Sequence, residues 1–147
     1  HMLRNYIGED NFRKGIRNYY KKYYNSTTTT NQFKNEMEVV SGMNLDTFFA
    51  QWLYKGGNIV LDGNWKFDEK KGRIEVNLNQ VQNDGYLFDM PVELGISYND
   101  KNLEKIQTVK LEKEKGRFYI ASDSKPISIK IDPNTKLLAI WDFNEIK

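Results

Sequence analysis

Cysteine is absent from the 147 residues, and histidine occurs only once, at the first position. The lack of cysteine excludes a disulfide framework and any metal site made of thiolates. Zinc sites need three or four nitrogen, sulfur or oxygen ligands held close together, and Ser, Cys or Thr nucleophiles usually need a neighbouring histidine as base. We therefore predict no metal ligand and no catalytic residue in this chain, and we assign no substrate-binding residue.

Prolines, glycines and long apolar runs are also scarce, and the formal charge is small. Three prolines and ten glycines argue against a low-complexity chain, and no stretch of about 18 apolar residues is present to span a membrane. A net charge of +2 implies no strong field toward nucleic acids or membranes, so we expect neither as a partner. In contrast, aromatic residues make up 14% of the chain, enough to build a core in one domain or two small ones.

Apolar residues follow a helical period up to about residue 55. Gly8 is placed to end a first helix over residues 2–7, and a second helix follows. Its apolar stripe comprises Phe12, Ile16, Tyr19, Tyr20 and Tyr23. Thr29 and Gln32 fit a capping box at the start of a third helix. The strongest helical pattern comes last, at Leu45, Phe48, Phe49, Trp52 and Leu53.

From Ile59 onward the apolar residues alternate with polar ones, which is typical of strands with one dry face. About seven short strands are separated by turn signals such as Asn83-Asp84-Gly85 and Asn99–Asn102, and Gly63 suggests a bulge in the first strand. The predicted fold is therefore α+β. A short helical subdomain over residues 1–55 precedes an antiparallel β-sandwich over residues 57–147.

Four other features allow a functional interpretation and a plainer structural one. The basic and aromatic stretch Arg13–Tyr24 could stack on nucleic-acid bases, but its charges and rings sort onto different helix faces. Trp65 and Trp141 could stack on sugars, although such rings more often fill cores. The Asn-Asp pairs are too short for a calcium loop and suit ordinary turns. Paired carboxylates could support glycoside hydrolysis, yet each candidate suits an outward-facing strand position: Asp62, Asp68, Glu75, Asp89 and Glu93.

Several short segments also occur in a characteristic order. In the helical part they are His1–Arg4, Gly8, Asn11-Phe12, Gly15, Tyr19 or Tyr20, Thr28-Thr29, Gln32-Phe33, Ser41–Leu45, Phe49–Leu53 and Gly57. In the strand part they are Leu78–Gln82, Met90–Val92 and Ile131–Pro133. This order resembles the aminopeptidase N family of zinc metallopeptidases, over the stretch that follows the catalytic core and runs into a β-sandwich. The family's H-E-x-x-H helix, downstream zinc-binding Glu, substrate loop and catalytic Tyr are all missing, and Asn58 stands where members often have proline.

The resemblance implies that the chain is a non-catalytic carboxyl-terminal part of a zinc aminopeptidase. The chain alone would be inactive and hold no cofactor, while the parent would use zinc and act on peptides. The parent's catalytic domain would be its partner. The side chains expected to join the helices to the supporting sandwich are Phe12, Phe33, Phe48, Phe49 and Trp52. Cut from that partner, the fragment is expected to self-associate or to have a loosely ordered amino terminus.

One alternative is a stand-alone β-sandwich adhesion or ligand-binding module, and a carboxylate-dependent enzyme is another. The pair His1-Met2 fits both native sequence and a cloning scar. The cellular compartment is not indicated.

Overall fold

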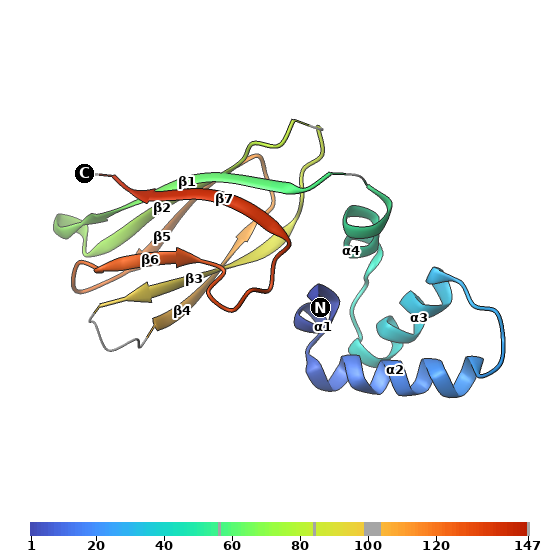
Figure 1. The fold of residues 1–147 in the computed structure, drawn as a ribbon. Helices are drawn as coiled ribbons and strands as arrows, with labels where there is room; N and C mark the ends of the chain where they lie inside the picture. Colours follow the sequence, from blue (N-terminus) through green and yellow to red (C-terminus); the bar gives the residue numbers. More distant parts are fainter. Residues whose placement is uncertain (56, 84, 99–103, 147) are drawn as a thin grey trace. The chain divides into compact units, whose positions relative to one another are not determined.

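The computed structural model describes residues 1–55, 57–83, 85–98 and 104–146, and it divides into two compact units. The first unit is His1–Gly56 and the second is Gly57–Lys147 (Figure 1). Asp84 and the turn predicted at Asn99–Asn102 lie outside the described residues. Helices in the first unit and a β-sandwich in the second confirm the predicted α+β class.

The helical unit has four α-helices within its described residues. They are α1 (Met2–Ile7), α2 (Glu9–Tyr23), α3 (Thr30–Ser41) and α4 (Asp46–Phe49), and α4 continues into a π-helical turn over Ala50–Tyr54. The predicted capping box is confirmed, because Thr29 N donates to Gln32 Oε1 at 2.8 Å and Gln32 N donates to Thr29 Oγ1 at 3.4 Å. Such a cap contributes about 1 kcal/mol.

The core of this unit is built mainly from residues of α1, α3 and α4. It contains Ile7, Met37, Leu45 and Phe49, with Leu3, Phe12, Phe33 and Phe48 packed against it. Gly15 lets α2 approach α3 closely, since a Cβ there would lie 2.5 Å from Met37 Sδ. The predicted stripe on α2 is too wide: Ile16 is 39% exposed and Tyr20 is 65% exposed. The buried face of α2 therefore includes Gly15, whose small size allows the close contact with α3, and does not include Tyr20.

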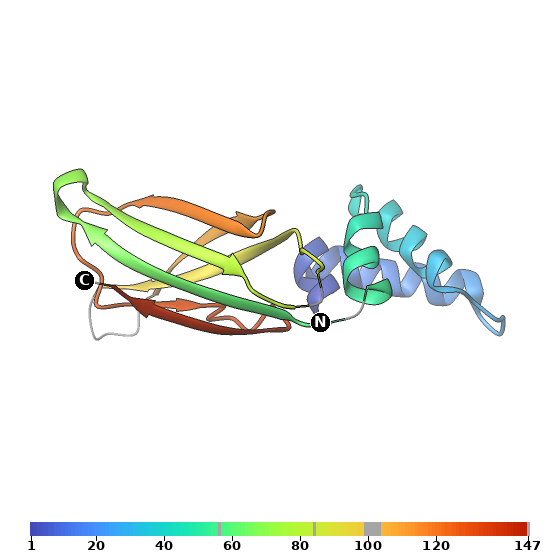
Figure 2. The same cartoon turned by 90° about the horizontal axis from the view of Figure 1, so that it is seen from above.

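The second unit consists of two sheets stacked as layers (Figure 2). Its strands are β1 (Ile59–Asp68), β2 (Arg73–Gln80), β3 (Met90–Ser97), β4 (Glu104–Leu111), β5 (Lys115–Ala121), β6 (Ser128–Ile131) and β7 (Ala139–Glu145). Among the described residues, one sheet has the order β5-β2-β1-β7 and the other β4-β3-β6. All pairs are antiparallel except β1 with β7, which run parallel.

The predicted alternation is confirmed in the central strands. In β2, Ile74, Val76 and Leu78 are fully buried, while the residues between them are half-buried. The inner face of β3 is formed in the same way by Val92, Leu94 and Ile96. Because alternate side chains of a strand point to opposite faces, these strands supply the dry interior of the sandwich.

Gly63 does not form the predicted bulge. Its register is continuous with Leu78 of β2 and with Phe143 of β7. A Cβ at this position would lie 2.6 Å from the Asn77 carbonyl oxygen and 2.8 Å from Leu78 Cδ2. Close approach of the neighbouring strands therefore explains the glycine.

Gln80 is a buried polar residue that ties the segment after β2 to the sheet. Its Oε1 accepts from Phe88 N at 2.8 Å, and its Nε2 donates to the Phe88 carbonyl at 2.8 Å. The same Nε2 lies 3.2 Å from the Lys113 carbonyl, and Gln82 Nε2 donates to Gln80 Oε1 at 3.1 Å. This side chain thus satisfies backbone groups that the ladder does not pair.

Candidate functional site

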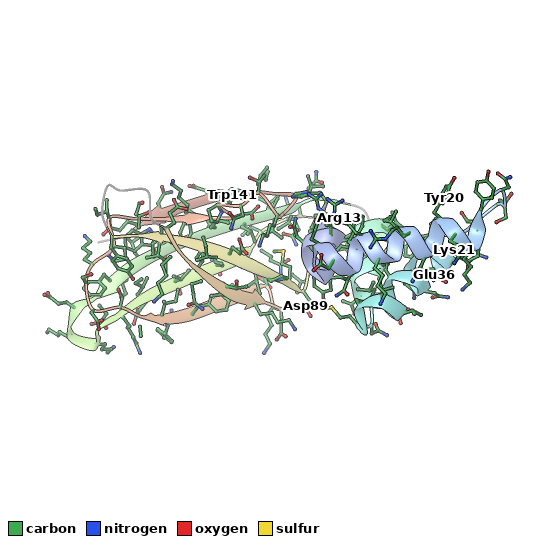
Figure 3. The ribbon with its side chains drawn as sticks, turned by 90° about the horizontal axis from the view of Figure 1, so that it is seen from below. Arg13, Tyr20, Lys21, Glu36, Asp89 and Trp141 are labelled. Carbon is green, nitrogen blue, oxygen red and sulfur yellow. The ribbon has the colours of Figure 1, made fainter. Side chains whose placement is uncertain are left out.

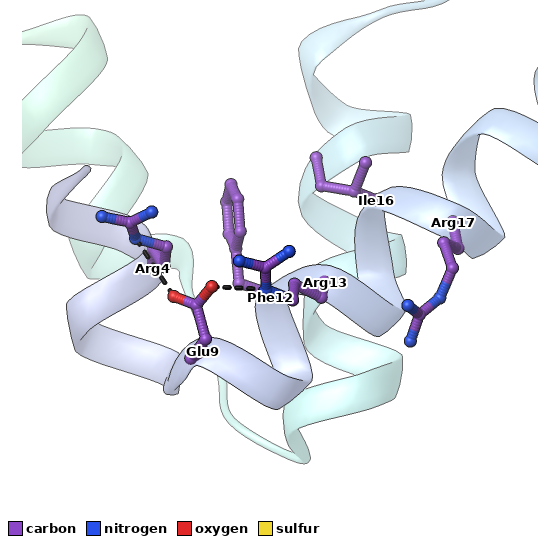
Figure 4. A pocket seen from close by; sticks show the side chains of 6 residues that line it. All are labelled: Arg4, Glu9, Phe12, Arg13, Ile16 and Arg17. Atoms are coloured by element: carbon purple, nitrogen blue, oxygen red, sulfur yellow. Dashed lines mark hydrogen bonds and ion pairs between the residues drawn. The ribbon is translucent and has the colours of Figure 1, made fainter.

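The most concentrated group of charged side chains in the helical unit lies where α1 meets α2. Gly8, with a φ of 87°, ends α1 and precedes Glu9, the first residue of α2. The Glu9 carboxylate lies between two guanidinium groups: Arg13 Nε is 2.5 Å from Oε1 and Arg4 Nε is 3.3 Å from Oε2 (Figure 4). Arg4 Nη2 also lies 3.2 Å from His1 Nδ1. One carboxylate therefore orients two arginines from different helices.

These side chains surround an open hollow of about 320 Å³. It is lined by Arg4, Glu9, Phe12, Arg13, Ile16 and Arg17, and we call it the arginine hollow (Figure 4). Within the described part of the chain, the guanidinium group of Arg17 has no hydrogen bond or ion pair. Three guanidinium groups against one carboxylate leave an excess of two positive charges. The chemistry that this arrangement supports is the binding of an anionic group, since guanidinium pairs well with planar oxyanions.

The five carboxylates considered from the sequence do not come together. Asp62 is exposed, Asp68 accepts from Lys71 N, Glu75 pairs with Arg73 and Lys66, Asp89 with Lys110, and Glu93 with Lys136 and Asn134. A hydrogen bond from Arg73 and the nearby Lys66 lower the pKa of Glu75, despite its partial burial. A lowered pKa keeps the group ionised, which is the wrong state for a general acid. The plainer reading of these residues as outward-facing charges, four of them paired with neighbouring groups, is therefore favoured.

The two tryptophans considered as a sugar platform have different surroundings. Trp65 is 3% exposed and belongs to the core of the sandwich. Trp141, on β7 (Figure 3), is 41% exposed. It lines a second hollow with Phe143, Ile129 and Ile131. The ring of Trp65 is therefore not available for stacking on a ligand.

The described residues do not fit a zinc ion. Over the ranges that the structure describes, no three His, Cys, Asp or Glu side chains are grouped so that they could hold a metal. None of the described helices is long and apolar enough to cross a membrane.

The arginine hollow was not predicted from the sequence. An acidic residue such as Glu9 suits the first turn of a helix because of the helix dipole alone, so its presence there does not indicate a site. Glu9, Arg13 and Arg17 follow one another at a spacing of four, which places them in a row on one face of α2. This spacing is the only feature of the sequence that indicates a row of charged side chains on α2. The contribution of Arg4 depends on the turn at Gly8, which periodicity does not reveal.

Comparison with known proteins relates both units to peptidases. Residues 1–52 match the sequence model of the Peptidase family M1 domain. A probable aminopeptidase 2 of Sulfurisphaera tokodaii is 31% identical over 135 residues, which cover 89% of this chain and 16% of that protein. Aminopeptidase N of Lactococcus lactis subsp. lactis is 32% identical over 61 residues, or 42% of this chain and 7% of that protein.

A solved structure shows the same fold. The crystal structure of Legionella pneumophila aminopeptidase A aligns with a TM-score of 0.78 at 15% identity, covering 96% of this chain and 16% of that one. The chain thus spans about a sixth of the length of the relatives that it matches over most of its own length.

These matches define the chain as peptidase-related. More particularly, it is related to the M1 aminopeptidases, which confirms the family recognised from the order of its short segments.

Proposed function

We propose that this chain is a non-catalytic, carboxyl-terminal part of an M1-type zinc aminopeptidase. In this proposal residues 1–55 form the helical end of the catalytic region, and residues 57–147 form a supporting β-sandwich. The zinc chemistry of peptide hydrolysis belongs to the rest of the longer polypeptide. Because the side chains that the structure describes do not fit a zinc ion, we assign no catalytic step to them.

The observation that carries the proposal is the match of residues 1–52 to the M1 peptidase domain, in a stretch where no three possible metal ligands are grouped. The relatedness also extends across the sandwich, since 89% of the chain aligns with an aminopeptidase. This extent favours an integral part of such an enzyme over a stand-alone adhesion or ligand-binding module. The packed aromatic rings of Phe33, Phe48 and Phe49 in the helical core are consistent with a supporting role.

The first test concerns activity and metal content. We expect the 147-residue chain to contain no stoichiometric zinc and to leave an aminoacyl p-nitroanilide intact. The longer polypeptide should carry an H-E-x-x-H sequence ahead of this segment and should lose its turnover when zinc is chelated. A stop codon directly ahead of residue 1, or zinc with turnover in the isolated chain, would contradict the proposal.

The supporting role has its own test within the longer polypeptide. Phe49→Ala should leave a cavity in the helical core and make the aminopeptidase activity heat-labile, because removing a buried phenylalanine costs about 3–5 kcal/mol. Val39→Ala is the matched control, since Val39 is 75% exposed. Equal heat stability of the two variants would show that the activity does not depend on this unit.

The isolated chain is also expected to self-associate. Five large side chains of the helical unit are 55–75% exposed: Tyr20, Tyr24, Val39, Leu53 and Tyr54. Exposed apolar groups of this kind drive association when their normal cover is missing. Sedimentation velocity should show concentration-dependent oligomers that diminish when Leu53 and Tyr54 are both replaced by serine. A single monomer boundary at all concentrations would contradict this expectation.

A further inference from the structure

We propose that the arginine hollow binds a peptide segment in which a carboxylate side chain stands beside an apolar one. Charge is the first reason. The helix α2 contains five of the 22 basic residues and two of the 20 acidic residues, so the remaining chain holds 17 basic and 18 acidic residues. The excess of positive charge is thus concentrated on this one helix, and the hollow is on its exposed side.

Geometry is the second reason. Glu9 engages Arg13 through Nε, and no hydrogen bond within the described residues occupies the terminal nitrogens of Arg13. Arg17 stands one turn further along α2, at the other end of the hollow (Figure 4). An incoming carboxylate can therefore accept from the terminal nitrogens of Arg13, whose position Glu9 partly sets before the carboxylate binds, while Arg17 supplies a second positive charge in the same hollow. Such preorganisation reduces the entropy cost of binding.

The apolar lining is the third reason, and it indicates which anion is bound. Phe12 stands between the Arg4 and Arg13 guanidinium groups in Figure 4, and Ile16 is 39% exposed at the same hollow. Inorganic phosphate makes no use of such surface. A peptide that carries glutamate next to leucine places a carboxylate on the arginines and an aliphatic chain against Ile16.

Nucleic acid fits this surface less well than an acidic peptide. The 15 residues of α2 span only about 22 Å, so few backbone phosphates could be contacted at once. Glu9 and Asp10 would repel phosphates at the amino-terminal end of α2. The exposed rings of Tyr20 and Tyr24 lie beyond the hollow, in the last turns of the helix and just after it.

The test uses the full 147-residue chain and does not depend on the proposed peptidase role, because its readout is binding alone. A fluorescein-labelled peptide that alternates glutamate and leucine is titrated at low salt and followed by anisotropy. Arg17→Gln is expected to weaken binding about tenfold, as a lost charge-assisted hydrogen bond predicts. Ile16→Ser should weaken it about threefold or more, through the lost apolar contact.

Lys14→Gln is the matched control, because it removes one positive charge from an exposed position of α2 outside the hollow. It should change the affinity less than twofold, and circular dichroism should show that all the variants keep their helix content. The proposal is overturned if the glutamine version of the peptide binds equally well. It is also overturned if Lys14→Gln weakens binding as much as Arg17→Gln, or if inorganic phosphate or oligothymidine competes better than unlabelled peptide.

Discussion

Replacing Gly63 with valine is expected to lower the free energy of unfolding of the sandwich by about 3 kcal/mol, at the upper end of the usual cost of overpacking. Valine favours strands, so intrinsic propensity alone predicts a gain. The added atoms would instead meet the Asn77 carbonyl oxygen at 2.6 Å, Leu78 Cδ2 at 2.8 Å and Phe143 Cδ2 at 3.0 Å. A backbone oxygen cannot rotate away as a side chain can. The strands on both sides of β1 would therefore have to separate.

Urea denaturation followed by tryptophan fluorescence measures this effect, because Trp65 is buried two residues further along the same face of β1. The matched control is Asp62→Val, which puts the same side chain on the exposed face of the same strand. That control should change the free energy of unfolding by no more than about 0.5 kcal/mol, as is usual for surface substitutions, and so leave the urea midpoint nearly unchanged. Equal midpoints for the Gly63 and Asp62 variants would show that the neighbouring strands yield without cost.

Gln80→Leu is the second substitution with a large expected effect, a loss of about 2–5 kcal/mol. Leucine fills a similar volume but removes the acceptor of the Phe88 amide and the donor to the Phe88 carbonyl. Each buried polar group that loses its partner costs about 1–3 kcal/mol. The donor to the Lys113 carbonyl is lost as well. Phe88 itself is 1% exposed, so water does not readily replace these bonds.

Hydrogen exchange of the Phe88 amide reports on this site directly and should accelerate in the Gln80→Leu variant, together with a lower unfolding midpoint. Gln107→Leu is the appropriate control, since that half-buried side chain donates only to the adjacent Thr108 carbonyl. If both variants unfold at the same urea concentration, the buried side-chain amide of Gln80 contributes no more to the stability of the sandwich than that of Gln107.

The parts of the fold that depend on local chemistry were predictable from the sequence. Thr29 and Gln32 satisfy each other's backbone groups within one turn, so the start of α3 needs no tertiary information. Alternation in β2 likewise reflects a single rule of strand geometry. Gly63 was misinterpreted because a bulge and a close approach both select glycine. The parallel pairing of β1 with β7 was missed because nothing local marks which strands become neighbours.

The arginine hollow likewise combines features that the local sequence predicts with features that depend on tertiary structure. The row formed by Glu9, Arg13 and Arg17 follows from helical spacing, whereas the participation of Arg4 requires the change of direction at Gly8. Exposure of Ile16 was not predicted because the sequence lacks any sign that Gly15 is the point of close contact with α3. Glycine has no apolar side chain, so a buried glycine does not contribute to the hydrophobic periodicity from which a buried helix face is predicted.

The pairing of β7 with β1 also sets an order of events during synthesis on the ribosome. Ile59 lies opposite Ala139, so the outer edge of β1 stays unpaired until the last strand has emerged. An unpaired edge is a template for pairing with another chain, and contacts between distant positions form slowly. The nascent sandwich is therefore most prone to aggregation just before β7 is translated. Slowing of translation at that point should increase the insoluble fraction of newly made protein.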